Sequence, residues 1–153
     1  MPYTAWKHMP QTCSSAENVS AEVVERVSLL AIVWGAESYA WSNLGVSLQL
    51  SEELSQAEEV FKRALSLATT QEAHVILSNL GILYRHQKKY QLAKAMFTKS
   101  LELKPGYAPA FNNMGLIFVT EGLLEEAKYC FEKALQSDPM LDAAKSNSIK
   151  MRL

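Results

Sequence analysis

Three glycines mark a repeated segment, because the residues around each of them follow the same pattern. Gly45, Gly81 and Gly115 are separated by 36 residues (45 to 81) and 34 residues (81 to 115). A large apolar residue precedes each glycine by four positions, and an alanine and a phenylalanine follow it by twelve and sixteen positions. These residues are Trp41, Leu77 and Phe111; Ala57, Ala93 and Ala127; and Phe61, Phe97 and Phe131. Self-similarity at such a period predicts a stack of similar units, each of which buries its apolar face against its neighbours.

This pattern identifies a family resemblance. A helix-turn-helix repeat of about 34 residues with W-x-x-L-G-x-x-Y, then A-x-x-x-F and then proline, is typical of the tetratricopeptide repeat. Over roughly residues 38–141 the chain resembles that family, with Pro105 and Pro139 ending the second and third copies. The resemblance implies an all-α fold, a right-handed solenoid of antiparallel helix hairpins.

The repeat spacing divides the chain into six segments. Pro2 and Pro10 oppose a helix in the leader, whereas Val23, Val27 and Trp34 recur at helical spacing. Ile149 replaces the repeated glycine near the end, which favours a capping helix there. We expect a flexible leader (1–14), an N-terminal packing helix or degenerate half-repeat (15–37), three repeats (38–73, 74–107 and 108–141) and a C-terminal capping helix (142–153).

Helix bounds and turns follow from the same alignment of the repeats. Glycine and alanine allow the two helices of a hairpin to approach closely, and the three phenylalanines are expected to fill the next layer. Lys88 stands in a turn where the family often has glycine. The expected hairpin helices are 38–50 and 53–67, 72–86 and 90–103, and 107–120 and 124–136.

A row of asparagines is the candidate binding site. Asn43, Asn79 and Asn113 each lie two residues after the large apolar residue, and asparagine is a poor residue for a helix interior. An amide offers a donor and an acceptor, which is the complement of a peptide backbone unit. The row resembles the asparagine ladder in the superhelical repeats of the O-linked N-acetylglucosamine transferases. Alternatively, the asparagines bond the neighbouring helix and stabilise the stack.

Other residues surround this row. Val46, Ile82 and Leu116 form an apolar shelf beside the amides, which serves either as a ligand pocket or as packing between helices. Arg85 could select an acidic group on a peptide. The remaining rim residues are Tyr39, Ser78, His86 and Thr120.

The family's chaperone-binding clamp is not matched. In tetratricopeptide co-chaperones, lysine, arginine and asparagine side chains hold a C-terminal carboxylate. Of the corresponding residues only Asn79 fits, and without the cations a buried carboxylate would lack compensation. The corresponding residues are Ser42, Val46, Asn79, Pro109 and Asn113. A chaperone-binding role is therefore disfavoured.

Several function classes have little support in the sequence. The net charge of −1, with acidic and basic residues mixed, argues against nucleic-acid binding. The longest apolar run (29–34) is too short to enter and cross a bilayer. Two cysteines far apart fit a reducing compartment, so we expect a cytoplasmic or nuclear protein. His74 and His86 are expected to be solvated or capping residues, and Cys130 to be a small buried side chain.

No nucleophile, phosphate-binding or metal motif accompanies the repeats, so we expect no enzyme activity, no cofactor and no bound metal. The sequence favours a protein–protein interaction adaptor that holds an extended segment of a partner in a concave groove. The alternative is a structural subunit, or a fragment of a larger assembly, that uses its ends or its convex face. Oligomeric state and partner identity are not specified.

Overall fold

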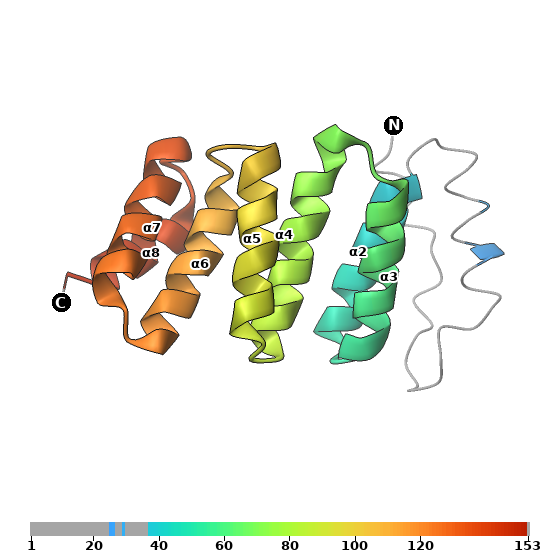
Figure 1. Ribbon diagram of the computed structural model, residues 1–153, viewed down its shortest axis with the longest axis horizontal. Coiled ribbons are helices and arrows are strands. Elements are labelled where there is room, and N and C mark those ends of the chain that lie inside the picture. The colour runs from blue at the N-terminus through green and yellow to red at the C-terminus, as the bar shows by residue number, and fades with distance from the viewer. Residues whose placement is uncertain (1–24, 27–28, 30–36, 153) are drawn as a thin grey trace. The chain divides into compact units, whose positions relative to one another are not determined.

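The computed structural model describes residues 25–26, 29 and 37–152 of the 153-residue chain. The expected leader, and most of the expected N-terminal packing helix, lie outside these residues. From residue 37 onward the described chain forms seven α-helices and no strand (Figure 1). The helices are α2 (Glu37–Leu50), α3 (Leu54–Leu67), α4 (Thr70–His86), α5 (Tyr90–Leu103), α6 (Ala108–Glu121), α7 (Leu124–Ser137) and α8 (Asp142–Lys150). The all-α solenoid of antiparallel helix hairpins is confirmed, and each hairpin helix begins and ends within two residues of its expected bounds.

The chain divides into two compact units at Thr69 and Thr70. The first unit contains the α2–α3 hairpin, whose buried centre includes Trp41 and Phe61. The guanidinium of Arg63 lies 4.8 Å from the centre of the Trp41 ring and covers one face of it. The second unit contains the α4–α5 and α6–α7 hairpins followed by α8, with α5 packed against α6 and α7 against α8.

Each hairpin is held by a phenylalanine that lies directly over a glycine. A Cβ added to Gly81 would come within 2.6 Å of Cε1 of Phe97, so no side chain fits between the ring and the α4 backbone. The same relationship holds for Gly45 with Phe61 and for Gly115 with Phe131. The sequence analysis assigned the rings to the next layer of the stack, but each contacts the glycine of its own hairpin. Glycine therefore recurs at this position for two reasons: the phenylalanine ring occupies the space that a side chain would need, and the two helix backbones approach closely.

The turns between paired helices share one backbone conformation. Glu52, Lys88 and Gly122 occupy equivalent positions and have φ angles of 63°, 60° and 77°. In the middle turn the N–H of Lys89 donates to the carbonyl of Tyr84 at 2.8 Å, which closes the end of α4 in the manner of a Schellman motif. The replacement of glycine by Lys88 leaves the turn unchanged, and the lysine adopts the left-handed conformation.

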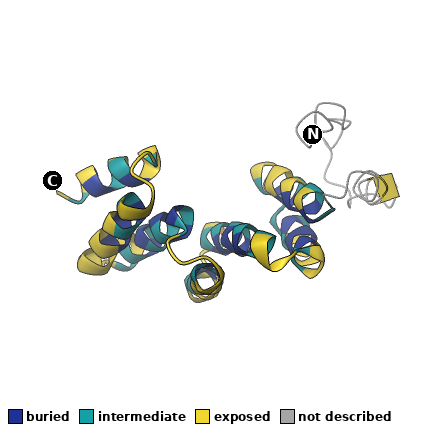
Figure 2. Ribbon diagram, turned by 90° about the horizontal axis from the view of Figure 1, so that it is seen from above, coloured by how far each residue is buried: buried dark blue, intermediate teal, exposed yellow. Residues whose placement is uncertain are grey.

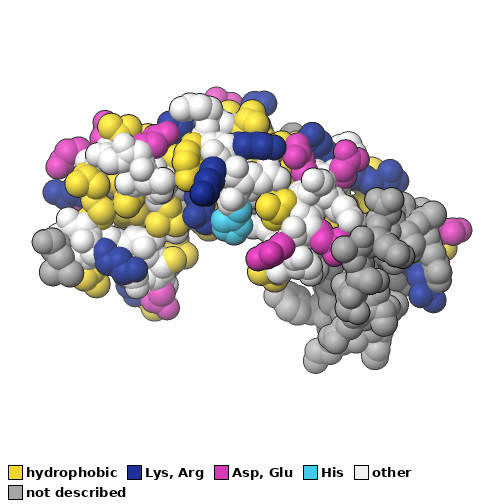
Figure 3. Space-filling view, turned by 90° about the horizontal axis from the view of Figure 1, so that it is seen from below, with side chains coloured by type: hydrophobic (Ala, Val, Ile, Leu, Met, Phe, Trp, Pro, Cys, Tyr) yellow, Lys and Arg dark blue, Asp and Glu magenta, His cyan; other side chains and the backbone are white. Residues whose placement is uncertain are grey.

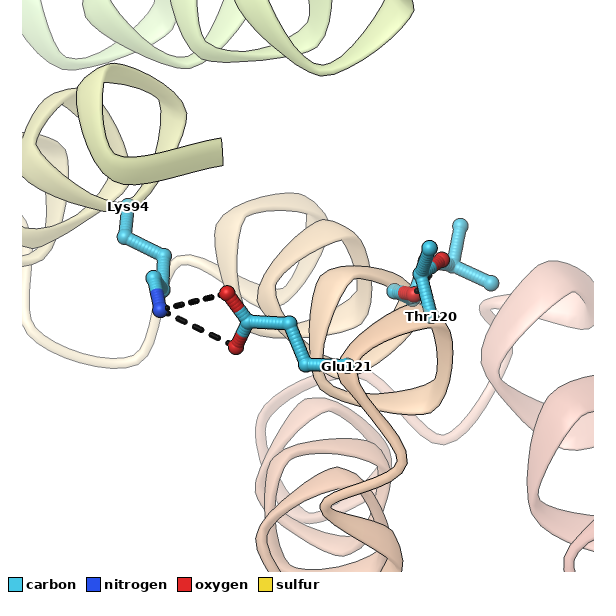
Figure 4. Close-up of polar contacts among 4 residues, drawn as sticks. Lys94, Thr120 and Glu121 are labelled. Atoms are coloured by element: carbon cyan, nitrogen blue, oxygen red, sulfur yellow. Dashed lines mark hydrogen bonds and ion pairs between the residues drawn. The ribbon is translucent and has the colours of Figure 1, made fainter. Parts of the chain in front are cut away.

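Polar contacts link neighbouring helices of the second unit. Nζ of Lys94 on α5 lies 2.9 Å and 3.0 Å from the two carboxylate oxygens of Glu121 on α6 (Figure 4). Oγ of Ser100, which is fully buried, donates to the carbonyl of His74 at 2.7 Å and ties α5 to α4. Ala108 on α6, Ala134 on α7 and Ala144 on α8 form a small buried cluster that joins these three helices. The buried residues lie along the faces that the helices turn toward each other (Figure 2).

Candidate peptide-binding surface

The three asparagines occupy equivalent positions on the first helix of each hairpin. Asn43 lies on α2 in the first unit and is exposed. Asn79 on α4 and Asn113 on α6 belong to the second unit and are half-buried. Because α4 and α6 contact each other, the second unit brings two of the predicted amides onto neighbouring helices.

The hydrogen bonds of this row differ from one position to the next. Nδ2 of Asn113 donates to the carbonyl of Pro109 at 2.9 Å, one turn earlier in the same helix. The equivalent residue of α8, Asn147, donates instead to Oδ1 of Asn112 on α6, also at 2.9 Å. The alternative interpretation, an amide that bonds the neighbouring helix, therefore describes Asn147.

Asn112 is a polar residue that the sequence analysis did not select. Its side chain is 6% exposed, and it is the acceptor for Asn147. The sequence feature that could have identified Asn112 is its position directly before Asn113. A second asparagine at this place needs its own hydrogen-bond partner if its side chain is buried.

The residues predicted to form the apolar shelf are only partly accessible. Ile82 and Leu116 are half-buried on α4 and α6, whereas Val46 on α2 is 36% exposed. Oγ1 of Thr120 donates to the carbonyl of Leu116 at 3.0 Å, so this rim hydroxyl bonds its own helix. In the second unit the shelf leaves some apolar surface beside the amides.

Arg85 is the cation nearest this shelf on α4. Its Nη2 atom lies 3.3 Å from Nε2 of His86, and its Nε atom is buried without a hydrogen-bond partner among the described residues. Burial lowers the pKa of the Arg85 guanidinium, and the neighbouring Tyr90 opposes that effect. Arginine nevertheless remains charged in proteins. An acceptor brought by a ligand would therefore meet a cation that is already partly desolvated.

Two further predictions for the rim have different outcomes. Tyr39 is 46% exposed on α2, as a contact residue requires. Ser78 is only 2% exposed, so its assignment to the rim is wrong. Ser78 lies 100° round the helix from Asn79, on the side of α4 that is covered.

The assignment of His74 to a solvated or capping position is also wrong. Helix α4 begins at Thr70, and the His74 side chain is buried with its ring edge-on to Tyr107, the two ring centres being 4.8 Å apart. Burial, with a smaller contribution from the charge of Lys104, lowers the pKa of His74. Burial also raises the pKa of Tyr107. The pair is part of the packing between α4 and the start of α6.

Reactive groups elsewhere in the described chain are inert or solvated. Cys130 is 4% exposed, as expected, and burial raises the pKa of its thiol to about 11. The carboxylate of Glu58 pairs with Nζ of Lys62 at 2.9 Å, one turn later in the same helix. In residues 25–26, 29 and 37–152, no three His, Cys, Asp or Glu side chains are grouped so that they could hold a metal ion. None of the described helices has the length and apolar character needed to span a membrane.

Solved structures share this arrangement of helices. The Sgt2 TPR domain from Aspergillus fumigatus superposes with a TM-score of 0.68 at 23% identity, covering 76% of this chain and 77% of that chain. The first TPR of Spaghetti (RPAP3), solved bound to the HSP90 peptide SRMEEVD, superposes with a TM-score of 0.66 at 19% identity, covering 75% and 90% of the two chains.

Two curated proteins are similar in sequence. Heat shock protein STI1 from Saccharomyces cerevisiae is 28% identical over 95 residues, which are 62% of this chain and only 16% of STI1. Photosystem I assembly protein Ycf3 from Rippkaea orientalis is 26% identical over 126 residues, which are 77% of this chain and 72% of Ycf3. The sequence pattern of the tetratricopeptide repeat family matches residues 36–106 and 72–139. Since these stretches together cover more than half of the chain, the protein belongs to the tetratricopeptide repeat family.

Proposed function

We propose that the chain is a non-catalytic adaptor whose second unit binds an extended segment of a partner protein along α4 and α6. The observation that supports this proposal is the equivalent placement of Asn79 and Asn113 on contacting helices, with Ile82 and Leu116 beside them. Amides can hydrogen-bond a peptide backbone of any sequence, whereas an apolar shelf selects particular side chains. On the first unit, Asn43, Val46 and Tyr39 remain predicted contacts.

Structural neighbours support the class of ligand. The first TPR of Spaghetti was solved with an HSP90 peptide, and the second TPR domain of human RPAP3 with an HSP70 peptide. In this chain Val46 and Pro109 stand at two positions where the chaperone clamp uses polar or charged side chains. We therefore propose an internal segment of a partner, held by its main chain, in preference to a chaperone C-terminus.

The test is a double substitution, Asn79→Ala with Asn113→Ala. Affinity capture on immobilised wild-type chain, read by mass spectrometry, identifies candidate partners, and a peptide array of each partner locates the bound segment. The double variant is expected to lose most of this binding while its melting temperature stays close to that of the wild type. The matched control is Gln91→Ala with Gln136→Ala, which removes two exposed amides from α5 and α7.

A loss of stability equal to the loss of binding would instead assign the two asparagines to the helix stack. Retention of the same partners and peptides by the double variant would contradict the proposal directly. A stable double variant that loses the peptides, alongside a Gln control that keeps them, is the supporting result.

One observation favours the second candidate, a structural subunit. Met140 and Ile149 are 76% and 60% exposed near the C-terminal end of the second unit, where they could contact another chain. Light scattering of the purified protein separates the two candidates. A defined oligomer that Ile149→Ser converts to a monomer would support the assembly role.

A further inference from the structure

Basic residues are concentrated in one repeat, although the composition of the whole chain is balanced. Between residues 73 and 101 the sequence contains five lysine and arginine residues and no aspartate or glutamate. The prediction that acidic and basic residues are mixed is therefore wrong for the second repeat. Three of these five cations, Arg85, Lys88 and Lys89, lie at the turn between α4 and α5.

The other two hairpins show that this turn does not need cations. The positions of Arg85, Lys88 and Lys89 are filled by Gln49, Glu52 and Glu53 in one hairpin and by Val119, Gly122 and Leu123 in the other. All three turns have the same backbone conformation. Lysine also replaces the residue best suited to the left-handed position, which is glycine. The basic residues therefore require an explanation other than the fold of the hairpin.

These cations differ from their neighbour Lys94 in their partners. Lys94 is neutralised by the carboxylate of Glu121. Arg85, Lys88 and Lys89 form no ion pair within the described part of the chain, and Nε of Arg85 has no hydrogen-bond partner there. Nζ of Lys89 lies 5.9 Å from the centre of the Tyr84 ring, which carries no compensating charge. The positive charge at the turn is thus uncompensated.

Exposed apolar side chains lie at the next turn of the same unit. Val119, Leu123 and Leu124 are 39%, 42% and 53% exposed at the α6–α7 turn. Figure 1 shows the α4–α5 and α6–α7 turns on the same edge of the second unit, and α5 packs against α6 between them. Figure 3 views this edge and shows Lys, Arg and His side chains gathered together, with hydrophobic side chains beside them.

We propose that this turn edge, formed by Arg85, Lys88 and Lys89 with Val119, Leu123 and Leu124, binds a partner segment that carries acidic residues at one end and apolar residues at the other. Charge complementarity gives such a segment its orientation, because Glu125 and Glu126 are exposed beside the leucines and repel carboxylates from that end. The same two glutamates oppose an anionic membrane as the occupant. This surface lies at the C-terminal ends of α4 and α6, so the proposal does not depend on the asparagine row.

The test uses a labelled synthetic peptide whose first half is rich in glutamate and whose second half is rich in leucine. Fluorescence anisotropy measures its affinity for the whole chain. The main variant is Lys88→Glu with Lys89→Glu, which copies the natural Glu52–Glu53 turn and is therefore compatible with the hairpin. The matched control is Lys99→Glu with Lys128→Glu, the same change of charge at exposed positions on α5 and α7.

The turn variant is expected to weaken binding by about tenfold or more, and the control by no more than about twofold, because only close charges act strongly at moderate salt. A second peptide has glutamine in place of every glutamate and therefore lacks the negative charges. Its affinity for the wild type should be as low as the affinity of the original peptide for the turn variant. Leu123→Ser with Leu124→Ser should weaken the original peptide and leave a peptide without leucine unaffected.

Equal losses of peptide affinity in the turn variant and the control would overturn the proposal, and so would the absence of measurable peptide binding to the wild type. A third contradicting result comes from vesicles that contain phosphatidylserine: the turn variant would lose binding to the vesicles while its affinity for the peptide stayed unchanged. The Asn79→Ala, Asn113→Ala variant should bind this peptide normally, so failure at the turn edge and failure of the asparagine row are distinguishable.

Discussion

Nδ2 of Asn147 donates a hydrogen bond to Oδ1 of Asn112, and this 2.9 Å contact joins the last described helix, α8, to α6. Asn112 is 6% exposed, so its carbonyl oxygen has little access to water if the donor is removed. The contact shows that an amide at the repeated position can serve the stack. It also specifies which asparagines to test for stability and which for binding.

Asn147→Ala should destabilise the protein by about 1–3 kcal/mol, because a buried acceptor then loses its partner. Urea unfolding measures the change. The double variant Asn112→Ala, Asn147→Ala should lose less than the sum of the two single variants, as expected for residues in contact. Additive losses would mean that the hydrogen bond contributes nothing. Asn113→Ala provides the comparison, since its amide bonds its own helix and its loss should be smaller.

Gly81→Ala should destabilise the second unit in spite of the better helix propensity of alanine. The new methyl would lie 2.6 Å from the Phe97 ring, and Phe97 is fully buried. Overpacking of this kind costs about 1–3 kcal/mol, which exceeds the roughly 0.5–1 kcal/mol gained by replacing a helical glycine. Thermal unfolding followed by circular dichroism should show a lower melting temperature.

The steric origin of that loss can be checked by making room for the methyl. Phe97→Leu alone should destabilise the protein, but adding Gly81→Ala to it should cost less than Gly81→Ala costs in the wild type. If the second substitution has the same effect in both backgrounds, contact with the ring is not the cause.

Lys88→Gly should stabilise the protein, because Lys88 has a φ of 60° and glycine adopts that conformation without strain. The left-handed conformation costs an ordinary residue about 1–2 kcal/mol, and the greater freedom of glycine in the unfolded chain offsets part of that gain. We expect a net gain of up to about 1 kcal/mol in the free energy of unfolding. Gly122→Ala is the reciprocal experiment: a Cβ there has nothing within 4 Å, so any destabilisation measures the backbone conformation alone.

The repeated residues made the architecture predictable, whereas the use of single polar side chains was not. The spacing of Gly45, Gly81 and Gly115 located every hairpin, since a solenoid applies the same packing rule at each copy. Ser78 and His74 were misplaced because whether a helix face is covered depends on its neighbour, and periodicity within one helix does not report that. The equivalent asparagines at 113 and 147 make different hydrogen bonds for the same reason.

The stability of the protein should fall as the pH falls below about 6.5, with His74 as a principal cause. Burial lowers the pKa of His74 in the folded state below the ordinary histidine value of about 6.5, so the unfolded chain binds a proton there more readily than the folded chain. The stabilisation from the neutral ring is therefore complete above the unfolded pKa and is lost as the pH falls through the folded pKa.

His86 has a lowered pKa for similar reasons, but its side chain is exposed and its contribution should be smaller. Urea unfolding across this pH range should show that His74→Gln removes more of the pH dependence than His86→Gln does. An unchanged pH profile in His74→Gln would mean that the buried ring at the α4–α6 contact is not responsible.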